Sequence, residues 1–380
     1  MDAVPSIIDR VNLLAPGFAE RAPLHDRAAS FPVENFQELS EAGLLALPVP
    51  KALGGAGAGV REAARVVSAV GKADAATALV LAMHYIHHLV IAKSGRWPAH
   101  LSERVSRDAV NGLALINALR VEPDQGSPSR GGLPQTTAKR TAEGWRITGR
   151  KIYSTGSPIL KWYTVWAKTD EPDVRVGVFL VPAGLPGTEI VETWDHLGLR
   201  ASGSHDVVFD DVVIPLANEI DVRRPGEWGQ PDIAQSTIQA VLVGAVYDGV
   251  ARAARDWLID FLRTRTPSSL GAPLATLPRA QEIVGGIEAK LAVNARLLDT
   301  FARDIDEGIA LTSVEANILK LTVTNNAVAA VEDALSLTSN HGLTRANPLE
   351  RHYRDVLCGR VHTPQDDSTK IFAGRLALGI

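Results

Sequence analysis

Cysteine is almost absent from this sequence, and charge of one sign never accumulates. The single Cys358 cannot form an internal disulfide, which is typical of a protein of the reducing cytoplasm. Lysine plus arginine number 39 against 43 for aspartate plus glutamate, and the formal net charge is -4. The composition indicates no basic stripe for nucleic acid or an anionic membrane, so nucleic acid is not an expected partner.

Long apolar runs are also missing. The stretch 240–254 is interrupted by Asp248 and Arg252, well before the roughly 20 residues that a bilayer crossing needs. The N-terminal stretch carries Asp2 and Asp9 and lacks the basic start, apolar middle and cleavage site of a secretion signal. We therefore expect no membrane span and a cytoplasmic location.

Three common catalytic motifs are missing as well. No GxGxxG follows a predicted strand, no GxxxxGK[ST] occurs, and the nearest approach to GxSxG, 198-GLRASGS-204, lacks the spacing of a nucleophile elbow. Kinase and hydrolase functions therefore lose their usual support.

The periodicity of the apolar residues changes twice along the chain. It is helical in the first part, alternates over short stretches bounded by Gly, Pro and Asp in the middle, and is helical again after Pro231. Long antiparallel helices imply a bundle. We therefore predict an α+β fold with an N-terminal α-helical domain (1–112), a middle antiparallel β domain (113–225) and a C-terminal four-helix bundle domain (226–380).

Several elements within these domains can be predicted. Four strands are expected at 145–149, 163–169, 176–182 and 206–215. The last of these alternates unevenly, which predicts a bulge. In the last domain, a Thr312-x-x-Glu315 capping box predicts a helix that begins there and reaches Leu337.

Three turns rich in Gly, Ser and Thr lie in the middle domain, at 122–128, 149–158 and 198–206. Such turns can bring backbone N–H groups and hydroxyls to a planar hydrogen-bonding ring or to a pyrophosphate. Taken singly, each could equally be an ordinary β-turn.

In their order along the chain, these turns resemble motifs of the acyl-CoA dehydrogenase superfamily. The string 122-EPDQGS-127 resembles its TEPxxGSD turn, 149-GRKIYSTG-156 its GxKxWITN turn, and 198-GLRASGSHDVVFDDVVIP-215 its GxRxSxxxxxxFxxVxVP signature. The first segment of helices and two segments of the bundle, 265–277 and 339–355, also resemble the family. The resemblance therefore covers nearly the whole chain.

The resemblance implies a flavin bound between the β domain and the bundle. By matched position, Tyr153 replaces a Trp that flanks the isoalloxazine ring, Thr155 provides a hydroxyl that hydrogen-bonds the flavin, and Ser154 lies between them. Ser127 matches the serine of the first turn, and Arg265 matches an arginine that reaches the flavin pyrophosphate of a neighbouring subunit. The cofactor is FAD or reduced FMN, and these residues leave the choice open.

The family's catalytic carboxylate is missing. Desaturation of an acyl thioester needs a base, and two counts from matched residues place the usual glutamate at Thr363, while its alternative position holds Gln239. Neither side chain can act as a base near neutral pH. Asp366 and Asp367 are possible replacements, although an acidic pair near a helix start is also typical of capping.

The segment 351-RHYRDVLCGRVHTPQDD-367 resembles the R-H-[WY]-R-[ND]-[IV]-x5-H-x-P-x-D pattern of flavin-dependent monooxygenases of the same fold, of the dibenzothiophene monooxygenase type. In those enzymes a partner reductase delivers reduced flavin, and oxygen is transferred to a small substrate. His362 is the histidine of the pattern and suits proton transfer at physiological pH. Arg354 and Asp355 are expected to form a structural ion pair.

A second group of histidines, 83-MHYIHH-88, lies on a predicted helix that is expected to face the flavin. His84 and His88 are four residues apart, share one helix face, and are further catalytic candidates, although histidines of this kind also serve in packing. No third ligand and no HExxH glutamate accompany them, so we expect no metal.

The leading hypothesis is a two-component monooxygenase that uses reduced flavin to oxygenate a small organic substrate. It implies a transient flavin reductase as partner, and the family resemblance implies a homotetramer built as a dimer of dimers. An acyl-CoA dehydrogenase with a relocated base and a non-catalytic flavin-bearing protein are the alternatives. The sequence does not identify the substrate.

Overall fold

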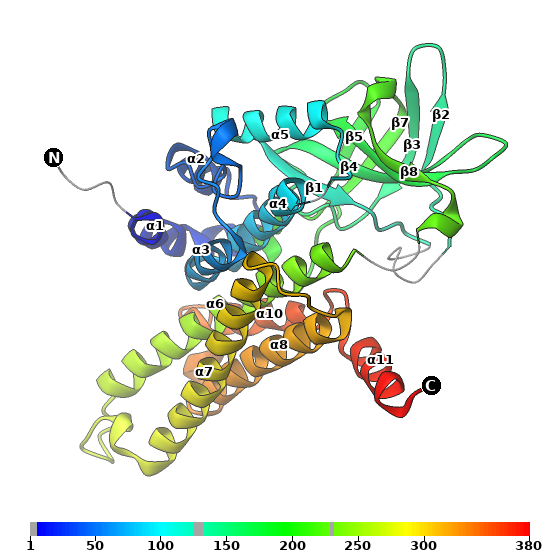
Figure 1. Ribbon diagram of the computed structural model, residues 1–380. Coiled ribbons are helices and arrows are strands. Elements are labelled where there is room, and N and C mark those ends of the chain that lie inside the picture. The colour runs from blue at the N-terminus through cyan, green and yellow to red at the C-terminus, as the bar shows by residue number, and fades with distance from the viewer. Residues whose placement is uncertain (1–5, 94, 125–131, 229–231) are drawn as a thin grey trace.

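The computed structural model describes residues 6–93, 95–124, 132–228 and 232–380 (Figure 1). Helices come first, a sheet follows, and helices return, so the predicted α+β order is confirmed. In Figure 1 the sheet lies at the upper right, the first helices at the upper left, and the long bundle helices below both.

The N-terminal part is helical throughout. Its helices are α1 (Ile7–Ala28), α2 (Val33–Glu41), α3 (Val60–Ala73), α4 (Ala75–Lys93) and α5 (Ala99–Asn111). A capping box between Ser6 and Asp9 begins α1, and the Asp74 carboxylate accepts a hydrogen bond from the Thr77 N–H in the first turn of α4.

Helix α4 is apolar around most of its circumference. Among the described residues it is the one helix whose length and composition, with a mean hydropathy of 1.6, would allow a membrane crossing. In this fold 72% of that stretch is buried, so its apolar surface is already covered by protein. Helix α4 is therefore a core helix of the fold.

The middle part is one eight-stranded sheet. Its strands are β1 (Leu115–Leu119), β2 (Thr137–Arg140), β3 (Trp145–Lys151), β4 (Leu160–Thr169), β5 (Val176–Pro182), β6 (Thr188–Val191), β7 (Asp206–Ile214) and β8 (Glu219–Arg223). The order is β6-β7-β3-β2-β4-β5-β8, with β1 beside β4. The predicted bulge is confirmed, since the β3–β7 register shifts between Ile147 and Gly149.

The sheet is mixed rather than purely antiparallel, which corrects one part of the prediction. Both β1 and β2 run parallel to β4, and the other pairings are antiparallel. Parallel neighbours need a long connection, and the chain makes one here by passing through β2 and β3 before it returns to β1 as β4. Local periodicity does not reveal which strands are neighbours.

The C-terminal part contains three long helices and several short ones. They are α6 (Ile233–Thr264), α7 (Pro278–Asp306), α8 (Ser313–Ser336), α9 (Asn340–Leu343), α10 (Leu349–Leu357) and α11 (Asp366–Leu378). The predicted capping box is confirmed, because the side chains and backbones of Thr312 and Glu315 exchange both hydrogen bonds at the start of α8.

The first and last groups of helices share one core. At the α3–α6 crossing, a Cβ added to Gly71 would lie 2.8 Å from the Val246 carbonyl oxygen, and one added to Gly249 would lie 2.4 Å from the Ser68 carbonyl oxygen. The two backbones can approach this closely only because both positions lack a side chain. One cluster of buried apolar residues runs through both helical parts and the inner face of the sheet.

Candidate functional site

A buried ion pair joins the first two Gly/Ser/Thr-rich turns. Lys151 Nζ lies 2.7 Å from Glu122 Oε1, and the two side chains are 0% and 2% exposed. Burial lowers the pKa of Lys151 to about 8, against the effect of Glu122. Burial alone would raise the pKa of Glu122, but hydrogen bonds from Lys151 and Thr136 lower it overall. Such a pair fixes one arrangement of the turns, because either charge alone would be buried without a partner.

The second turn carries Tyr153, Ser154 and Thr155, and backbone hydrogen bonds join it to the third turn. The Ser154 N–H donates to the His205 carbonyl over 3.1 Å, and the Gly156 N–H donates to the Ser202 carbonyl over 2.9 Å. Tyr153 has a left-handed backbone with φ of 56°, and its ring is 53% exposed. The turn therefore holds an exposed aromatic residue just beyond the end of strand β3.

A line of hydroxyl groups lies beside this ring. Thr155 Oγ1 is 2.9 Å from Ser204 Oγ, which is 2.8 Å from Ser202 Oγ. The Asn117 amide donates to the Thr155 carbonyl oxygen, and the buried Ser154 Oγ has no hydrogen-bond partner among the described residues. Sequence reasoning did not single out Ser202 and Ser204, although both lie in the third turn.

Two further rings accompany Tyr153. Trp194 and His196 stack on each other at 3.7 Å, and their centroids lie 6.3 and 5.9 Å from that of Tyr153. The exposed rings of Tyr153 and His196 and the half-buried Thr155 hydroxyl are groups that can contact a planar, hydrogen-bonding cofactor. These residues therefore fit the flavin that the family resemblance implies.

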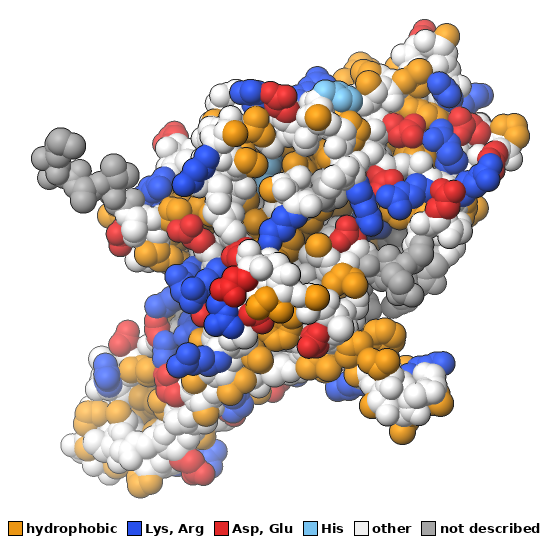
Figure 2. Space-filling view, viewed as in Figure 1, with side chains coloured by type: hydrophobic (Ala, Val, Ile, Leu, Met, Phe, Trp, Pro, Cys, Tyr) orange, Lys and Arg blue, Asp and Glu red, His pale blue; other side chains and the backbone are white. Residues whose placement is uncertain are grey.

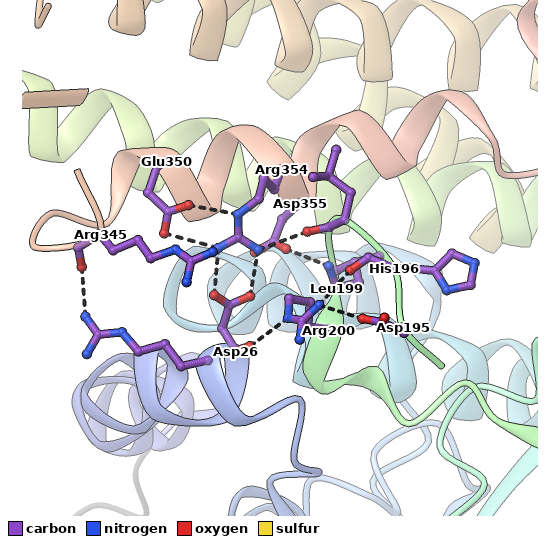
Figure 3. A network of polar contacts seen from close by, with 11 residues as sticks. Asp26, Asp195, His196, Leu199, Arg200, Arg345, Glu350, Arg354 and Asp355 are labelled. Atoms are coloured by element: carbon purple, nitrogen blue, oxygen red, sulfur yellow. Dashed lines mark hydrogen bonds and ion pairs between the residues drawn. The ribbon is translucent and has the colours of Figure 1, made fainter. Parts of the chain in front are cut away.

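The third turn is fixed to helix α10. The Leu199 N–H donates to Asp355 Oδ1 over 2.7 Å, and burial raises the pKa of Asp355 to about 7. Arg354 instead pairs with Asp26 at 2.6 Å and Glu350 at 2.8 Å (Figure 3). The expected Arg354–Asp355 ion pair is therefore wrong, since consecutive helical residues point about 100° apart and face different neighbours.

His362 follows α10 and is half-buried. Its ring centroid is 5.7 Å from that of Tyr247, and no described residue hydrogen-bonds its nitrogens. Burial and the nearby Lys320 charge lower the pKa of His362 to about 4, so the imidazole is neutral at physiological pH. The adjacent Thr363 is also half-buried and adds no charge.

Asp366 begins helix α11 and is held by helix α8. Its Oδ2 accepts a hydrogen bond from Asn325 over 2.8 Å, and its Oδ1 lies 3.9 Å from Lys320 Nζ. Lys320 also donates to the Pro364 carbonyl, so these contacts anchor the segment after His362. Asp367 bonds the backbone N–H of the next residue instead. Beyond this anchor, apolar side chains of α11 are exposed on the projecting helix (Figure 2): Ile371, Phe372, Leu376 and Leu378.

The two histidines predicted on α4 are both buried. His84 Nε2 lies 2.9 Å from the Leu45 carbonyl oxygen, and its Nδ1 accepts from the Ile116 N–H over 3.3 Å, so both nitrogens contact backbone. Burial lowers the pKa of His84 to about 4. The His88 ring packs 4.5 Å from His84 and has no hydrogen-bond partner among the described residues. No group of three metal-ligating side chains occurs in the part of the chain that the structure describes.

The third histidine of this string, His87, faces a cavity of about 100 Å³ between α4, the sheet and the start of α6. Its Nδ1–H donates to the Met83 carbonyl over 2.8 Å, which leaves Nε2 to accept from Thr164 Oγ1 at 3.3 Å. Burial lowers the pKa of His87 to about 4, so this ring is also neutral. The cavity is further lined by Arg120 and Trp228.

The predicted cofactor residues are only partly brought together. Tyr153, Ser154 and Thr155 form one turn, whereas Ser127 lies outside the described residues. Arg265 is exposed where α6 ends, and the α6–α7 connection lies at the end of the bundle away from the sheet (Figure 1). Within one chain, Arg265 is therefore not part of the site around Tyr153.

Three family models match successive parts of the chain. The acyl-CoA dehydrogenase N-terminal domain matches residues 12–96, the middle domain matches 120–212 and the C-terminal domain matches 241–366.

Relatives of this family match the chain over almost all of its length. "Putative acyl-CoA dehydrogenase YdbM" of Bacillus subtilis is 32% identical over 95% of this chain and 93% of its own. L-evernosamine nitrososynthase of a Micromonospora species is 30% identical over 99% of this chain and 90% of its own.

Solved structures give the same result. KijD3 in complex with dTDP superposes with a TM-score of 0.85 at 30% identity, over 98% of this chain and 96% of its own. FMN-bound TdsC from Paenibacillus sp. A11-2 has a TM-score of 0.84 at 20% identity, over 98% and 96% of the two chains, and shows the fold alone. The chain therefore belongs to the acyl-CoA dehydrogenase superfamily of flavoprotein oxidoreductases.

Proposed function

We propose that this protein is a two-component flavin monooxygenase, which receives reduced flavin from a separate reductase and oxygenates a small organic substrate. The observation that carries the proposal is the chemistry around position 363. The half-buried Thr363 stands where a desaturating relative needs its base, and the neutral His362 stands beside it. Gln239 holds no carboxylate at the alternative position.

The nearest candidate for a replacement base is already engaged. Asp366 accepts a hydrogen bond from Asn325 and faces the Lys320 ammonium, so moving it to a substrate would break both contacts and leave Lys320 buried without its counter-charge. This cost favours oxygenation over desaturation by a relocated base.

The residues of the second and third turns would hold the flavin. Tyr153 would flank the ring, the hydroxyl of Thr155 would meet its polar edge, and Ser154, whose hydroxyl is buried, would hold the turn between them. When bound and reduced, the flavin supplies the electrons that activate oxygen. FAD and FMN both remain candidates: a KijD3 structure contains FMN, whereas Arg265 would serve the pyrophosphate of FAD in a neighbouring subunit.

His362 is the proposed proton-transfer residue. Because its imidazole is neutral and no described residue occupies its nitrogens, one nitrogen can accept a proton from the substrate while the other donates a hydrogen bond. His84 has both nitrogens bonded to backbone, so the proposal gives it a role in packing α4 against the sheet. His88, buried against His84, remains a weaker catalytic candidate.

The names of several relatives support oxygen transfer. Three of the similar proteins are called nitrososynthases, a name that denotes formation of a nitroso group rather than a carbon–carbon double bond. Two are described as acting on amino sugars, and one KijD3 complex contains FMN with an amino-keto sugar nucleotide. We extend to this chain only the general reaction, oxygenation of a small substrate.

The experiment is a rapid-mixing measurement. Flavin-loaded protein is reduced without oxygen and mixed with oxygenated buffer, and the flavin absorbance is followed. We expect a transient species that forms before full reoxidation. Reoxidation in a single featureless phase would contradict the proposal.

Desaturation of acyl-CoA is the second candidate function, favoured by the 32% identical relative named as an acyl-CoA dehydrogenase. A panel of acyl-CoA thioesters is added to the oxidised, flavin-loaded protein without oxygen. Bleaching of the flavin would establish this function in place of the first, and inertness toward the whole panel would remove it.

The proposal includes a cytoplasmic location, a transient contact with a flavin reductase and assembly into a homotetramer. The exposed apolar residues on α11 suit a subunit contact, because an isolated projecting helix leaves them in water. We also propose that residues 1–112, 113–225 and 226–380 act as the three domains of each subunit.

A further inference from the structure

Arg120 is a guanidinium without a counter-charge inside the cavity that His87 faces. It follows the last residue of β1, is half-buried, and lies over the Trp166 ring with its Cζ atom 5.0 Å from the ring centroid. Its Nε is fully buried without a hydrogen-bond partner, and no described residue forms an ion pair with it. One indole ring therefore lies against this cation, and no described carboxylate pairs with it.

The other charges around this cavity are compensated. Asp221 pairs with Arg223 through two hydrogen bonds, of 2.6 and 2.7 Å. Asp232 lies 3.4 Å from Arg96 and also caps helix α6. Since the histidine is neutral, Arg120 is the one charge lining the cavity that lacks an opposite charge within the described part of the chain.

A half-buried guanidinium without a partner is costly in a folded protein, because burial removes water without returning an opposite charge. Its planar fork of N–H donors matches the two oxygens of a carboxylate. The cavity of about 100 Å³ admits a small group, and the rings of Trp97 and Trp228 line it together with Thr164. This combination suits an anionic group attached to an apolar or aromatic body.

Strand β1 connects this cavity with the proposed flavin turn. Ala118 and Arg120 line the cavity, whereas the side chain of Asn117, on the opposite face of the strand, donates to the Thr155 carbonyl oxygen. A group bound at Arg120 is therefore held by the same strand that fixes Thr155.

We propose that Arg120 recognises a carboxylate or phosphate group on the substrate, which is then a small organic acid with an apolar or aromatic body. The inference rests on the proposed function only in calling the bound molecule a substrate. The binding itself needs no flavin chemistry. His87 and Thr164 provide the neutral hydrogen-bonding groups of the same cavity.

The test measures binding by titration calorimetry on the full chain, with benzoate, phenyl phosphate and benzamide as probes. We expect benzoate or phenyl phosphate to bind about 10-fold or more tightly than benzamide, which has the same ring without the charge. Arg120→Met should remove this preference and leave benzamide binding unchanged. Phenyl phosphate exceeding benzoate would identify phosphate as the oxyanion.

Arg104→Met is the matched control. Arg104 lies over Trp162 at the same 5.0 Å, but it is exposed and lies outside the cavity. Its removal should leave all three affinities unchanged. Arg120→Lys, which keeps the charge and loses the fork, should give an intermediate preference and provides the comparison if Arg120→Met does not fold.

Three results would overturn the proposal. The first is that neither anion binds more tightly than benzamide. The second is that both anions bind equally to the wild type and to the folded Arg120 variants. The third is that Arg120→Met weakens flavin binding but leaves the preference for anions intact, which would assign the guanidinium to the cofactor. None of these results bears on the rapid-mixing test, so failure of this inference is distinguishable from failure of the proposed function.

Discussion

Two cations at the ends of strands, one buried and one half-buried, differ in whether the described chain supplies an opposite charge. Lys151, at the end of β3, is fully buried and satisfied by Glu122 at 2.7 Å. Arg120, just after β1, is half-buried and has no described counter-charge. The first arrangement is complete within the chain and therefore structural, whereas the second is incomplete until a ligand arrives.

The histidines repeat this contrast. His84 is buried with both nitrogens bonded to backbone, and His362 is half-buried with its nitrogens unoccupied by described residues. A group that is fully satisfied holds the fold together, and a group whose hydrogen-bonding atoms are left unsatisfied is available for chemistry.

The largest expected effect on stability comes from breaking the ion pair between Lys151 and Glu122. Lys151→Met leaves the Glu122 carboxylate buried without its partner, and we expect a loss of about 3–5 kcal/mol in the free energy of unfolding. Urea denaturation of both proteins measures it. A loss below about 1 kcal/mol would contradict the structural role, and the double variant Lys151→Met with Glu122→Gln should recover part of the stability.

Asp355 predicts how the stability of the fold depends on pH. Its pKa is raised from the model-compound value of 3.8 to about 7, so the folded state keeps this proton over a range in which the unfolded state loses it. The resulting stabilisation is complete below about pH 4 and is lost as the pH rises through 7.

Asp355→Asn should therefore remove a decline on the order of 3 kcal/mol between pH 4 and 7, because the amide oxygen can still accept from the Leu199 N–H without titrating. Urea midpoints measured at several pH values for both proteins test this. Parallel pH profiles would show that Asp355 does not titrate in this range.

The contrast between His84 and His362 predicts that replacing the first changes stability and replacing the second changes function. His84→Phe removes both backbone contacts and should cost about 2–3 kcal/mol, because the Leu45 carbonyl and the Ile116 N–H are left buried and unpaired. His362→Phe should change stability by less than about 1 kcal/mol.

The same His362→Phe variant should change the rate of the transient seen after mixing reduced, flavin-loaded protein with oxygen by about 10-fold or more. Stopped-flow absorbance measures this rate. An unchanged transient would remove His362 from the chemistry.

The smallest effect on stability is expected at Arg120, the cation without a described counter-charge. Arg120→Met should leave the free energy of unfolding within about 1 kcal/mol of the wild type, or raise it, because the variant removes an uncompensated charge and keeps the apolar contact with Trp166. The same denaturation experiment measures it. A loss as large as that of Lys151→Met would mean that Arg120 is a structural residue.

Much of the fold could be predicted because its signals are local. The capping box at Thr312 and the uneven alternation before Pro215 each appear within a few residues and are confirmed. The expected Arg354–Asp355 pair and the purely antiparallel sheet were wrong because both depend on which distant segments become neighbours.

The candidate site shows the same difference between residues with local signals and residues that depend on distant neighbours. Tyr153, Ser154 and Thr155 could be predicted as candidates because one turn holds them, and their motif is contiguous. Ser204 and Arg120 were missed because a serine in a turn and an arginine after a strand are ordinary in sequence, and only their neighbours make them distinctive.

The sequence by itself determined the family and the order of helices and strands, and it predicted that Thr363 replaces the catalytic glutamate, since each of these is written in residue identity and spacing. Only the tertiary structure decided which charges are satisfied. Whether Asp366 is anchored, Lys151 paired or Arg120 left open depends on side chains far apart in the chain, and burial makes those pairings energetically decisive.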